Sequence, residues 1–549
     1  MIGRCVAFLL TSGAAWAQIA APMLGWVPDG ARIRPVYGIP GSAAVGPSID
    51  ASHDFAVIAV SPRQDFVLAT DAVTGDALIV TGGSVTRLDG ATAGADRIVM
   101  SPRGMAAALW FSSTSRVQIV SGLPGAPSVR EVDASSLGGS PAAFALSDDG
   151  QWLAVGSPDG VYVFGSTGAT NRLPLDEPVA ALAFFQQRGD LVVATATRVM
   201  SVVDVGRADI SMIYNGADQP LAPVGVAVSF DNRRIVVADR AGALLTVDLT
   251  TGSAVTVDCA CSPGGVFGMG GSVFRLTDPA SGVMKLFDAL AGQVLFSPPA
   301  LEPGDRHRSA RRIVTFPLAT PSLPAVTIGG PATSGPAQQP AVTIALASAA
   351  PADFTGTFTL TFASSVGGDD QMIRFSNGTR TANFTIAAGS TAASFSGSPS
   401  IAVLTGTVAG TITLTATFSS AGNDVTPSPA PSHTIMTTAN VPFIQTVSLV
   451  QGTGGFSVVV TGFSTTREVV SGLFHFAPAT NSTVAQDDIT VQLGSAFSAW
   501  YSNSASNASG SLFTLTVPFT VANGNPGSIV AVTVTLTNTR GTSNPVSPQ

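Results

Sequence analysis

A repeat of about 42 residues in the N-terminal half is the feature that most restricts the fold of this chain. Each copy has an apolar stretch, a polar turn and a second apolar run. The copies lie at residues 57–69, 97–109, 143–155, 181–194, 225–238 and 265–276. Their turns are marked by Ser61, Ser101, Ser147, Phe185, Ser229 and Met269, which are 40, 46, 38, 44 and 40 residues apart. Three or four short strands in a repeat of this length are typical of a β-propeller blade. Residues 25–315 are therefore predicted to form an all-β propeller.

Two segments leave the number of blades open between six and seven. Residues 33–38 precede the first copy and are expected to form an outer strand that pairs with the last blade. Such closure would remove the free sheet edges that an open array exposes. Residues 283–315 follow the last copy and would add a seventh, partial blade.

The third copy is the most complete, and it carries a resemblance. Residues 143–155 read AFALSDDGQWLAV, close to the pattern V-x-x-A-V-S-x-D-G-x-x-L-A-V. This pattern resembles the bacterial YVTN/WD40-like propeller repeats, and the resemblance covers residues 25–315. The Trp-Asp endings of true WD40 blades are missing, so only the loose propeller family is implied.

The composition changes near residue 316, where charged residues almost vanish and Thr, Ser, Ala and Val dominate. Apolar residues and Thr then alternate, which places one face of a strand in a core and the other in water. Such strands are expected at residues 354–362, 381–386 and 410–418 and, after a linker at 426–431, at 457–461, 489–493, 512–517 and 530–536. We predict two β-sandwich domains, at 316–436 and 437–549, which resemble bacterial immunoglobulin-like (Ig-like) surface domains. That resemblance concerns the fold and implies no function.

The first 17 residues read as a secretion signal. Arg4 supplies the positive charge, residues 5–10 form a short apolar core, and residues 15–17 (Ala-Trp-Ala) form the cleavage site. This core is shorter than the roughly 20 apolar residues that cross a bilayer, and no transmembrane segment is predicted. We expect a mature chain that begins at Gln18 and is secreted, extracellular or attached to the cell surface, with a periplasmic location left open.

Charge restricts the partners. The formal net charge is −8 and the chain has no basic run, so nucleic-acid binding is not expected. Export favours an extracellular protein or a glycan as the partner.

No catalytic, cofactor-binding or metal-ligating residue is predicted. The four histidines are scattered, and a Gly-x-Ser-x-Gly motif is absent. The acidic pairs at 148–149, 369–370 and 487–488 leave weak calcium binding open, although they lack the Asp-x-Asp-x-Asp spacing of many calcium loops. Cys259 and Cys261 could close only a small, strained ring, so two small buried residues at a strand end are favoured over a local disulfide.

Four residues are candidates for binding. Arg63 and Arg103 recur after Ser-Pro in two copies and would contribute to an anion-binding rim, or they are solvated turn residues. Trp500 and Tyr501 would form an exposed aromatic platform for a sugar or a protein, or they pack within a strand.

Two functions from different classes follow from these features. The first is a secreted, non-catalytic binding or scaffold protein, in which the propeller presents the interaction surface and the sandwiches act as spacers or adhesive modules. The second is a secreted propeller hydrolase of the lactonase kind. That enzyme requires Asp, Arg and His side chains clustered at one channel mouth. Channel mouths lined only by Ala, Ser, Val and Gly would exclude the hydrolase.

Overall fold

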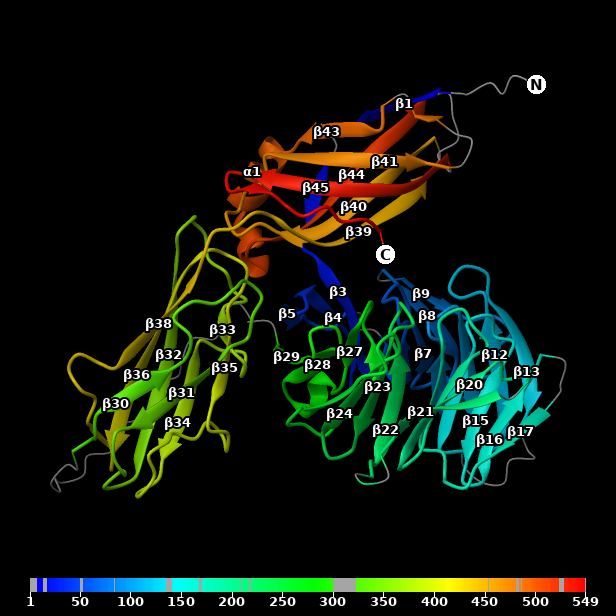
Figure 1. Ribbon diagram of the computed structural model, residues 1–549, viewed down its shortest axis with the longest axis horizontal. Coiled ribbons are helices and arrows are strands. Elements are labelled where there is room, and N and C mark those ends of the chain that lie inside the picture. Colours follow the sequence, from blue (N-terminus) through cyan, green and yellow to red (C-terminus); the bar gives the residue numbers. More distant parts are fainter. Residues whose placement is uncertain are drawn as a thin grey trace. The chain divides into compact units, whose positions relative to one another are not determined.

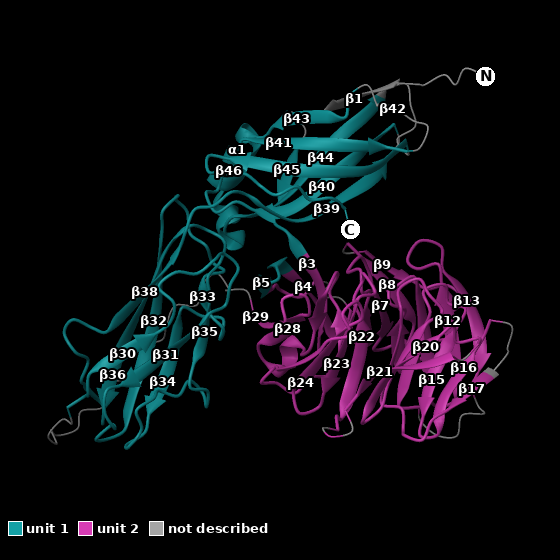
Figure 2. Ribbon diagram, in the orientation of Figure 1, with its two compact units in different colours: residues 1–23, 37–44, 300–549 teal, residues 24–36, 45–299 magenta. Residues whose placement is uncertain are grey.

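The computed structural model describes residues 7–12, 17–49, 53–82, 84–134, 141–166, 170–207, 209–216, 218, 220–299, 322–452, 454–479, 483–484, 486–522 and 528–548. The described chain is almost entirely β (Figure 1), and its one α-helix is α1 (Gly494–Ser502). It divides into two compact units (Figure 2). Residues 24–36 and 45–299 form the propeller unit, and residues 1–23, 37–44 and 300–549 form the C-terminal unit. No described helix is long and apolar enough to cross a membrane.

The propeller unit contains six four-stranded antiparallel sheets, each made of four consecutive strands. The first three are β6 (Phe55–Val60), β7 (Val67–Asp71), β8 (Ala77–Thr81) and β9 (Ser84–Arg87); β10 (Arg97–Met100), β11 (Ala106–Phe111), β12 (Arg116–Ser121) and β13 (Ser128–Asp133); β14 (Ala143–Leu146), β15 (Leu153–Ser157), β16 (Gly160–Phe164) and β17 (Thr170–Pro174). The others are β18 (Ala181–Phe184), β19 (Leu191–Ala194), β20 (Arg198–Val203) and β21 (Asp209–Asn215); β22 (Pro223–Val228), β23 (Arg234–Asp239), β24 (Ala243–Asp248) and β25 (Ala254–Asp258); β26 (Phe267–Gly268), β27 (Val273–Arg275), β28 (Met284–Asp288) and β29 (Gln293–Ser297). Each predicted copy of the repeat supplies the first two strands of one sheet, so the β-propeller prediction is confirmed.

Apolar side chains pack the sheets face to face. Leu68 of β7 and Leu109 of β11 belong to one buried core, and Trp110 packs against Phe144 with ring centroids 5.2 Å apart. Burying a large apolar side chain contributes about 1.5–3 kcal/mol, so these cores hold neighbouring sheets together.

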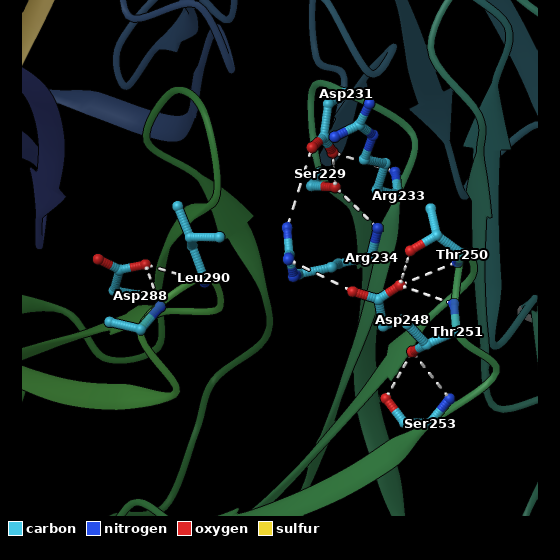
Figure 3. A network of polar contacts seen from close by, with 11 residues as sticks. Ser229, Asp231, Arg233, Arg234, Asp248, Thr250, Thr251, Ser253, Asp288 and Leu290 are labelled. Atoms are coloured by element: carbon cyan, nitrogen blue, oxygen red, sulfur yellow. Dashed lines mark hydrogen bonds and ion pairs between the residues drawn. The ribbon is translucent and has the colours of Figure 1, made fainter.

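The repeated serine closes the turn between the first two strands of a sheet. Ser229 is fully buried, and its Oγ accepts a hydrogen bond from the Arg234 amide at 2.9 Å and donates one to the Asp231 carboxylate (Figure 3). Ser147 does the same with the Trp152 amide at 3.0 Å and with Asp149. The serine hydroxyl thus supplies an acceptor for an amide of the turn, and buried amides are almost always hydrogen-bonded.

A second recurring turn was not predicted. Oδ1 of Asp248 accepts hydrogen bonds from the amides of Thr250 and Thr251 (Figure 3), and Gly252 then adopts a positive φ of 70°. Asp71 and Asp288 bind the amides two and three residues ahead in the same way. The sequence signal is an Asp followed four residues later by Gly.

The segment 33–38 does not pair with the last four-stranded sheet as expected. It lies in β4 (Arg32–Ile39), the middle strand of a separate sheet with β3 (Met23–Asp29) and β5 (Ser42–Val45). The boundary between the two units runs through all three strands. Residues 283–297 complete the sixth sheet as β28 and β29 rather than starting a seventh, and residues 300–315 lie outside the described part.

In the C-terminal unit, the first module contains two antiparallel sheets around one core. One sheet has the order β30 (Val326–Gly329), β31 (Ala341–Leu346), β35 (Ile401–Leu404) and β33 (Arg374–Phe375). The other has the order β34 (Thr381–Ile386), β32 (Phe354–Ser364), β36 (Gly410–Ser420) and β37 (Asn423–Asp424), with β38 (Ser432–Thr437) paired to β36. The alternation is visible in β36, where every second side chain from residue 410 is buried.

The second module also has two sheets around one core. The first contains β39 (Phe443–Gly452), β40 (Gly455–Phe463), β44 (Leu512–Ala522), β1 (Ala7–Ser12) and β42 (Thr483–Val484), with β2 (Gln18–Ala20) paired to β44. The second contains β43 (Asp488–Gln492), β41 (Ser471–Pro478), β45 (Ile529–Asn538) and β46 (Gly541–Thr542). Residues 15 and 16 of the predicted cleavage site lie outside the described residues, so the signal peptide stays a prediction.

Candidate functional site

The propeller unit holds a cavity of about 450 Å³ along its inner strands, the first strand of each sheet. Small ligand sites in proteins are typically about 300–1,000 Å³. Two residues before each turn marker, a cavity-lining side chain recurs, and these side chains are Ala59, Val99, Ala145, Ala183, Ala227 and Phe267. Five of these six are Ala or Val, which leaves space at the centre of the ring.

The two ends of the cavity differ in chemistry. Four antiparallel strands return the chain to its starting side, so all inner strands run in the same direction along the channel. Arg97 begins the inner strand β10 and lies at one end, the open mouth. Gln64 and Gln186 lie in turns that follow inner strands, and they mark the opposite end, the turn end.

Hydrogen bonds between successive turns join neighbouring sheets at the turn end. The carboxylate of Asp148, a buried residue, accepts from the Arg103 amide at 2.7 Å and from the Gln187 amide at 2.9 Å. The side chain of Asn232 binds both the amide and the carbonyl of Gln186, at 2.8 and 3.1 Å. These bonds connect the second to the fifth four-stranded sheets.

Two glutamines add to these hydrogen bonds between turns. Gln64 accepts from the Trp26 amide at 2.7 Å and donates to the Gly268 carbonyl at 2.9 Å, which links the first four-stranded sheet to β3 and to the sixth. Gln186, a buried residue, donates to the Pro102 carbonyl at 3.4 Å. Its Oε1 is buried and has no hydrogen-bond partner among the described residues, and the Gln186 side chain lines the cavity at the turn end.

Two arginines are the charged residues of the described lining. The guanidinium of Arg275 is buried, forms an ion pair with Asp278 and lies 4.3 Å from the centroid of the Phe267 ring. Burial lowers the pKa of Arg275 to about 9, so the side chain still carries its charge at pH 7. Arg97 is exposed at the open mouth, and its guanidinium lies 5.3 Å from the centroid of the Phe144 ring.

The described wall of the cavity contains no Asp, Glu or His side chain. Within the described ranges, no three His, Cys, Asp or Glu residues converge in a geometry that could hold a metal ion. The arrangement offers apolar contact along the wall, the Arg97 cation at one end and the uncharged amide side chains of Gln64 and Gln186 at the other.

The structure places Arg63 and Arg103 in turns, and neither lines the cavity. Arg63 is exposed and pairs with Asp65 at 2.8 Å. Arg103 contributes its amide to Asp148, while its side-chain Nε is buried without a hydrogen-bond partner in the described part of the chain.

Trp500 and Tyr501 lie on α1, not on a strand as expected. The Tyr501 hydroxyl donates to the Ser511 carbonyl at 2.6 Å, and the Arg467 guanidinium lies 5.0 Å from the ring centroid. Burial raises the pKa of Tyr501 above its usual range. Trp500 is half-buried. Tyr501 is therefore bound into the module rather than free to form an exposed platform.

The expectation for the two cysteines was wrong, because Cys259 and Cys261 form a disulfide with their Cα atoms 5.1 Å apart. Ala260 between them has a positive φ of 45°, which turns the chain so that both thiols meet on one side. Only Cys259 is fully buried.

The acidic pairs considered for calcium have protein partners. Both carboxylate oxygens of Asp148 bind backbone amides, Asp369 pairs with Arg380 at 2.8 Å, and Asp488 binds His475 at 2.8 Å. Asp370 is fully buried and accepts from the amides of the residues at 372, 407 and 408.

No family model and no curated protein matches this sequence. Among solved structures, a streptogramin B lyase is 13% identical with a TM-score of 0.36, and the alignment covers 52% of this chain and 88% of that chain. The β-propeller domain of Cps50 (Swd1) from Myceliophteria thermophila is 10% identical with a TM-score of 0.33, covering 48% and 96%. A chain of a nidogen/laminin complex is 13% identical with a TM-score of 0.31, and the alignment covers 44% of this chain and 93% of that chain. At these TM-scores the fold rests on the sheet topology described above.

Proposed function

We propose that this chain is an exported, non-catalytic binding protein whose propeller channel holds a small, largely apolar ligand. One observation carries the proposal: the channel has a cavity of ligand size with an apolar wall and a polar group at each end. A few placed polar groups in a mostly apolar concavity are characteristic of ligand sites. An extracellular protein or a glycan remains the proposed partner of the outer surfaces.

Export is supported by two features that are independent of each other. The first 17 residues follow the signal pattern, and Cys259 and Cys261 are joined by a disulfide. Disulfides persist mainly in oxidising compartments such as the periplasm and the extracellular space.

The propeller is proposed to have seven blades. Trp26 of β3 lines the channel, and Ile33 of β4 shares a buried core with Val67 of the first four-stranded sheet. A β-bridge between Val45 and Pro299 joins this three-stranded sheet to the segment that follows β29. The seventh blade would then be the three-stranded one, closed by the end of the sixth sheet.

The C-terminal unit is proposed to act as a spacer or adhesive stalk made of two Ig-like β-sandwiches. The two modules share buried polar contacts. Ser511 of the second module donates to the Thr407 carbonyl of the first at 2.7 Å, and its amide donates to the Thr407 hydroxyl at 3.0 Å. The Gln371 amide donates to the Asn507 carbonyl at 3.0 Å. Such contacts support a stalk that moves as one piece.

Titration with Nile red, an uncharged apolar dye, tests the channel site. We expect saturable binding of one dye per chain to the purified protein. Ala183→Phe fills the cavity and should abolish binding, whereas Ala254→Phe, on the exposed outer strand β25, should leave it unchanged. Absence of saturable binding, or equal binding by the filled variant, would contradict the proposal. Circular dichroism spectra of both variants verify that they fold.

A further inference from the structure

We infer that the channel ligand is a small apolar molecule with one anionic group, and that Arg97 binds this group at the open mouth. The inference rests on the proposed channel function. It concerns the chemical class of the ligand, which the apolar wall alone does not define.

Arg97 is an exception among equivalent residues of the repeat. It lies four residues before its turn marker and faces Trp110 across the ladder. The corresponding residues in the next sheets are Ala143, Ala181 and Gly225, which carry no charge. Among these equivalent positions, only the inner strand β10 therefore places a cation at the mouth of the channel.

This cation has no carboxylate partner among the described residues. Its guanidinium donates to the Pro141 carbonyl at 3.4 Å and lies over the Phe144 ring. The adjacent Asp96 carboxylate binds the amide and hydroxyl of Ser112 instead. Arg275, the other arginine of the described lining, does have an acidic partner in Asp278. The charge of Arg97 is therefore available to a ligand.

The other polar groups of the channel determine the orientation. Arg275 is already paired with Asp278 and stacked on Phe267, so it is less available to a second anion. At the turn end, the Gln186 amide is uncharged and its NH2 group donates to the Pro102 carbonyl, so it offers a carboxylate no cation. The anionic group is consequently placed at Arg97 and the apolar chain points towards Gln186.

The separation of the two ends sets an approximate ligand length. Arg97 and Met100 are three residues apart on β10, which spans about 10 Å at roughly 3.3 Å per residue, and the turn that carries Pro102 follows. Medium-chain carboxylates are therefore suitable probes.

Displacement of Nile red by decanoate, decanol and decylamine tests the inference at neutral pH. Decanoate should displace the dye at a concentration at least tenfold lower than decanol, and decylamine should be the weakest. Arg97→Gln should remove the preference for decanoate over decanol. Arg87→Gln, a matched change of an exposed arginine on β9, should preserve it.

Two results would overturn the inference while the dye still binds and the proposed function stands. In the first, decanol displaces the dye as well as decanoate does. In the second, Arg97→Gln still prefers decanoate over decanol. If the dye itself does not bind, the proposed function fails instead.

Discussion

At the scale of single residues, the repeat is conserved within this chain for a structural reason. Ser61, Ser101, Ser147 and Ser229 are all buried at the turn between the first two strands of their sheets. Where Phe185 replaces the serine, its amide still donates to the Asp190 carbonyl at 2.9 Å, the same backbone bond that closes the serine turns. The repeated residues thus close turns, while the cavity is lined by the less conspicuous alanines between them.

Replacing Ser147 by Ala should destabilise the propeller by about 1–3 kcal/mol, because the Trp152 amide loses its acceptor in a buried turn. Urea unfolding followed by circular dichroism measures this loss. Ser253→Ala, which removes an exposed hydroxyl, should change the free energy of unfolding by less than about 0.5 kcal/mol. Equal effects of the two changes would contradict the role of the buried serine.

Glu177 should make the propeller sensitive to acid. Hydrogen bonds from Thr195 and Thr197 lower the pKa of this carboxyl from 4.5 to about 2. Because the pKa is lower in the folded state, the stabilisation is present above pH 4.5 and is lost as the pH falls towards 2. The urea midpoint of the wild-type protein should therefore fall over this interval more than that of Glu177→Gln. Parallel pH profiles of the two proteins would show that the carboxyl contributes nothing.

At the scale of secondary-structure elements, periodicity predicted strands well and missed the helix. Alternation at 410–418 corresponds to β36, because one face of that strand is buried in the module core. The residues of α1 include Phe497, Trp500 and Tyr501, whose spacing of three and four is helical. That signal is short, since the helix has only nine residues, and Trp-Tyr favours strands by propensity.

Tyr501→Phe tests how α1 is held. Removing the hydroxyl leaves the Ser511 carbonyl without its 2.6 Å donor, and the expected loss is about 1 kcal/mol in the C-terminal unit. Tyr162→Phe removes a hydroxyl that binds the exposed Asp159 carboxylate and should have a smaller effect. Hydrogen exchange of peptides from each unit assigns the loss to its unit. An unchanged C-terminal unit would mean that α1 is held by packing alone.

At the scale of the whole molecule, the architecture followed from repeats and alternation, whereas the candidate site did not. A cavity depends on which residues of six distant segments face one axis. The alanines at 59, 145, 183 and 227 could have been found by aligning the copies, because they share one position. Arg97 could not have been singled out, because its lack of a carboxylate partner depends on contacts formed only in the fold.

The C-terminal unit is expected to unfold cooperatively because Arg467 links its two modules. This residue is 8% exposed, donates to the Gly510 and Tyr501 carbonyls at 3.1 and 2.9 Å, and reaches the Asp369 carbonyl of the first module at 3.4 Å. Arg467→Met would leave these carbonyls without a donor, at a cost of about 1–3 kcal/mol for each acceptor left buried. The substitution should weaken the contacts between the two modules and also lower the stability of the second module itself.

Hydrogen exchange in increasing urea shows whether the two modules unfold together or separately. In the wild-type protein, amides of β36 in the first module and β44 in the second should become exposed in one transition, since each module loses its partner when the other opens. In Arg467→Met the transition of β44 should move to lower urea and separate from that of β36. Arg540→Met removes an exposed arginine of the second module and should keep a single transition. Two transitions in the wild-type protein would mean that the modules open independently, and the stalk would then be a flexible pair rather than one rigid piece.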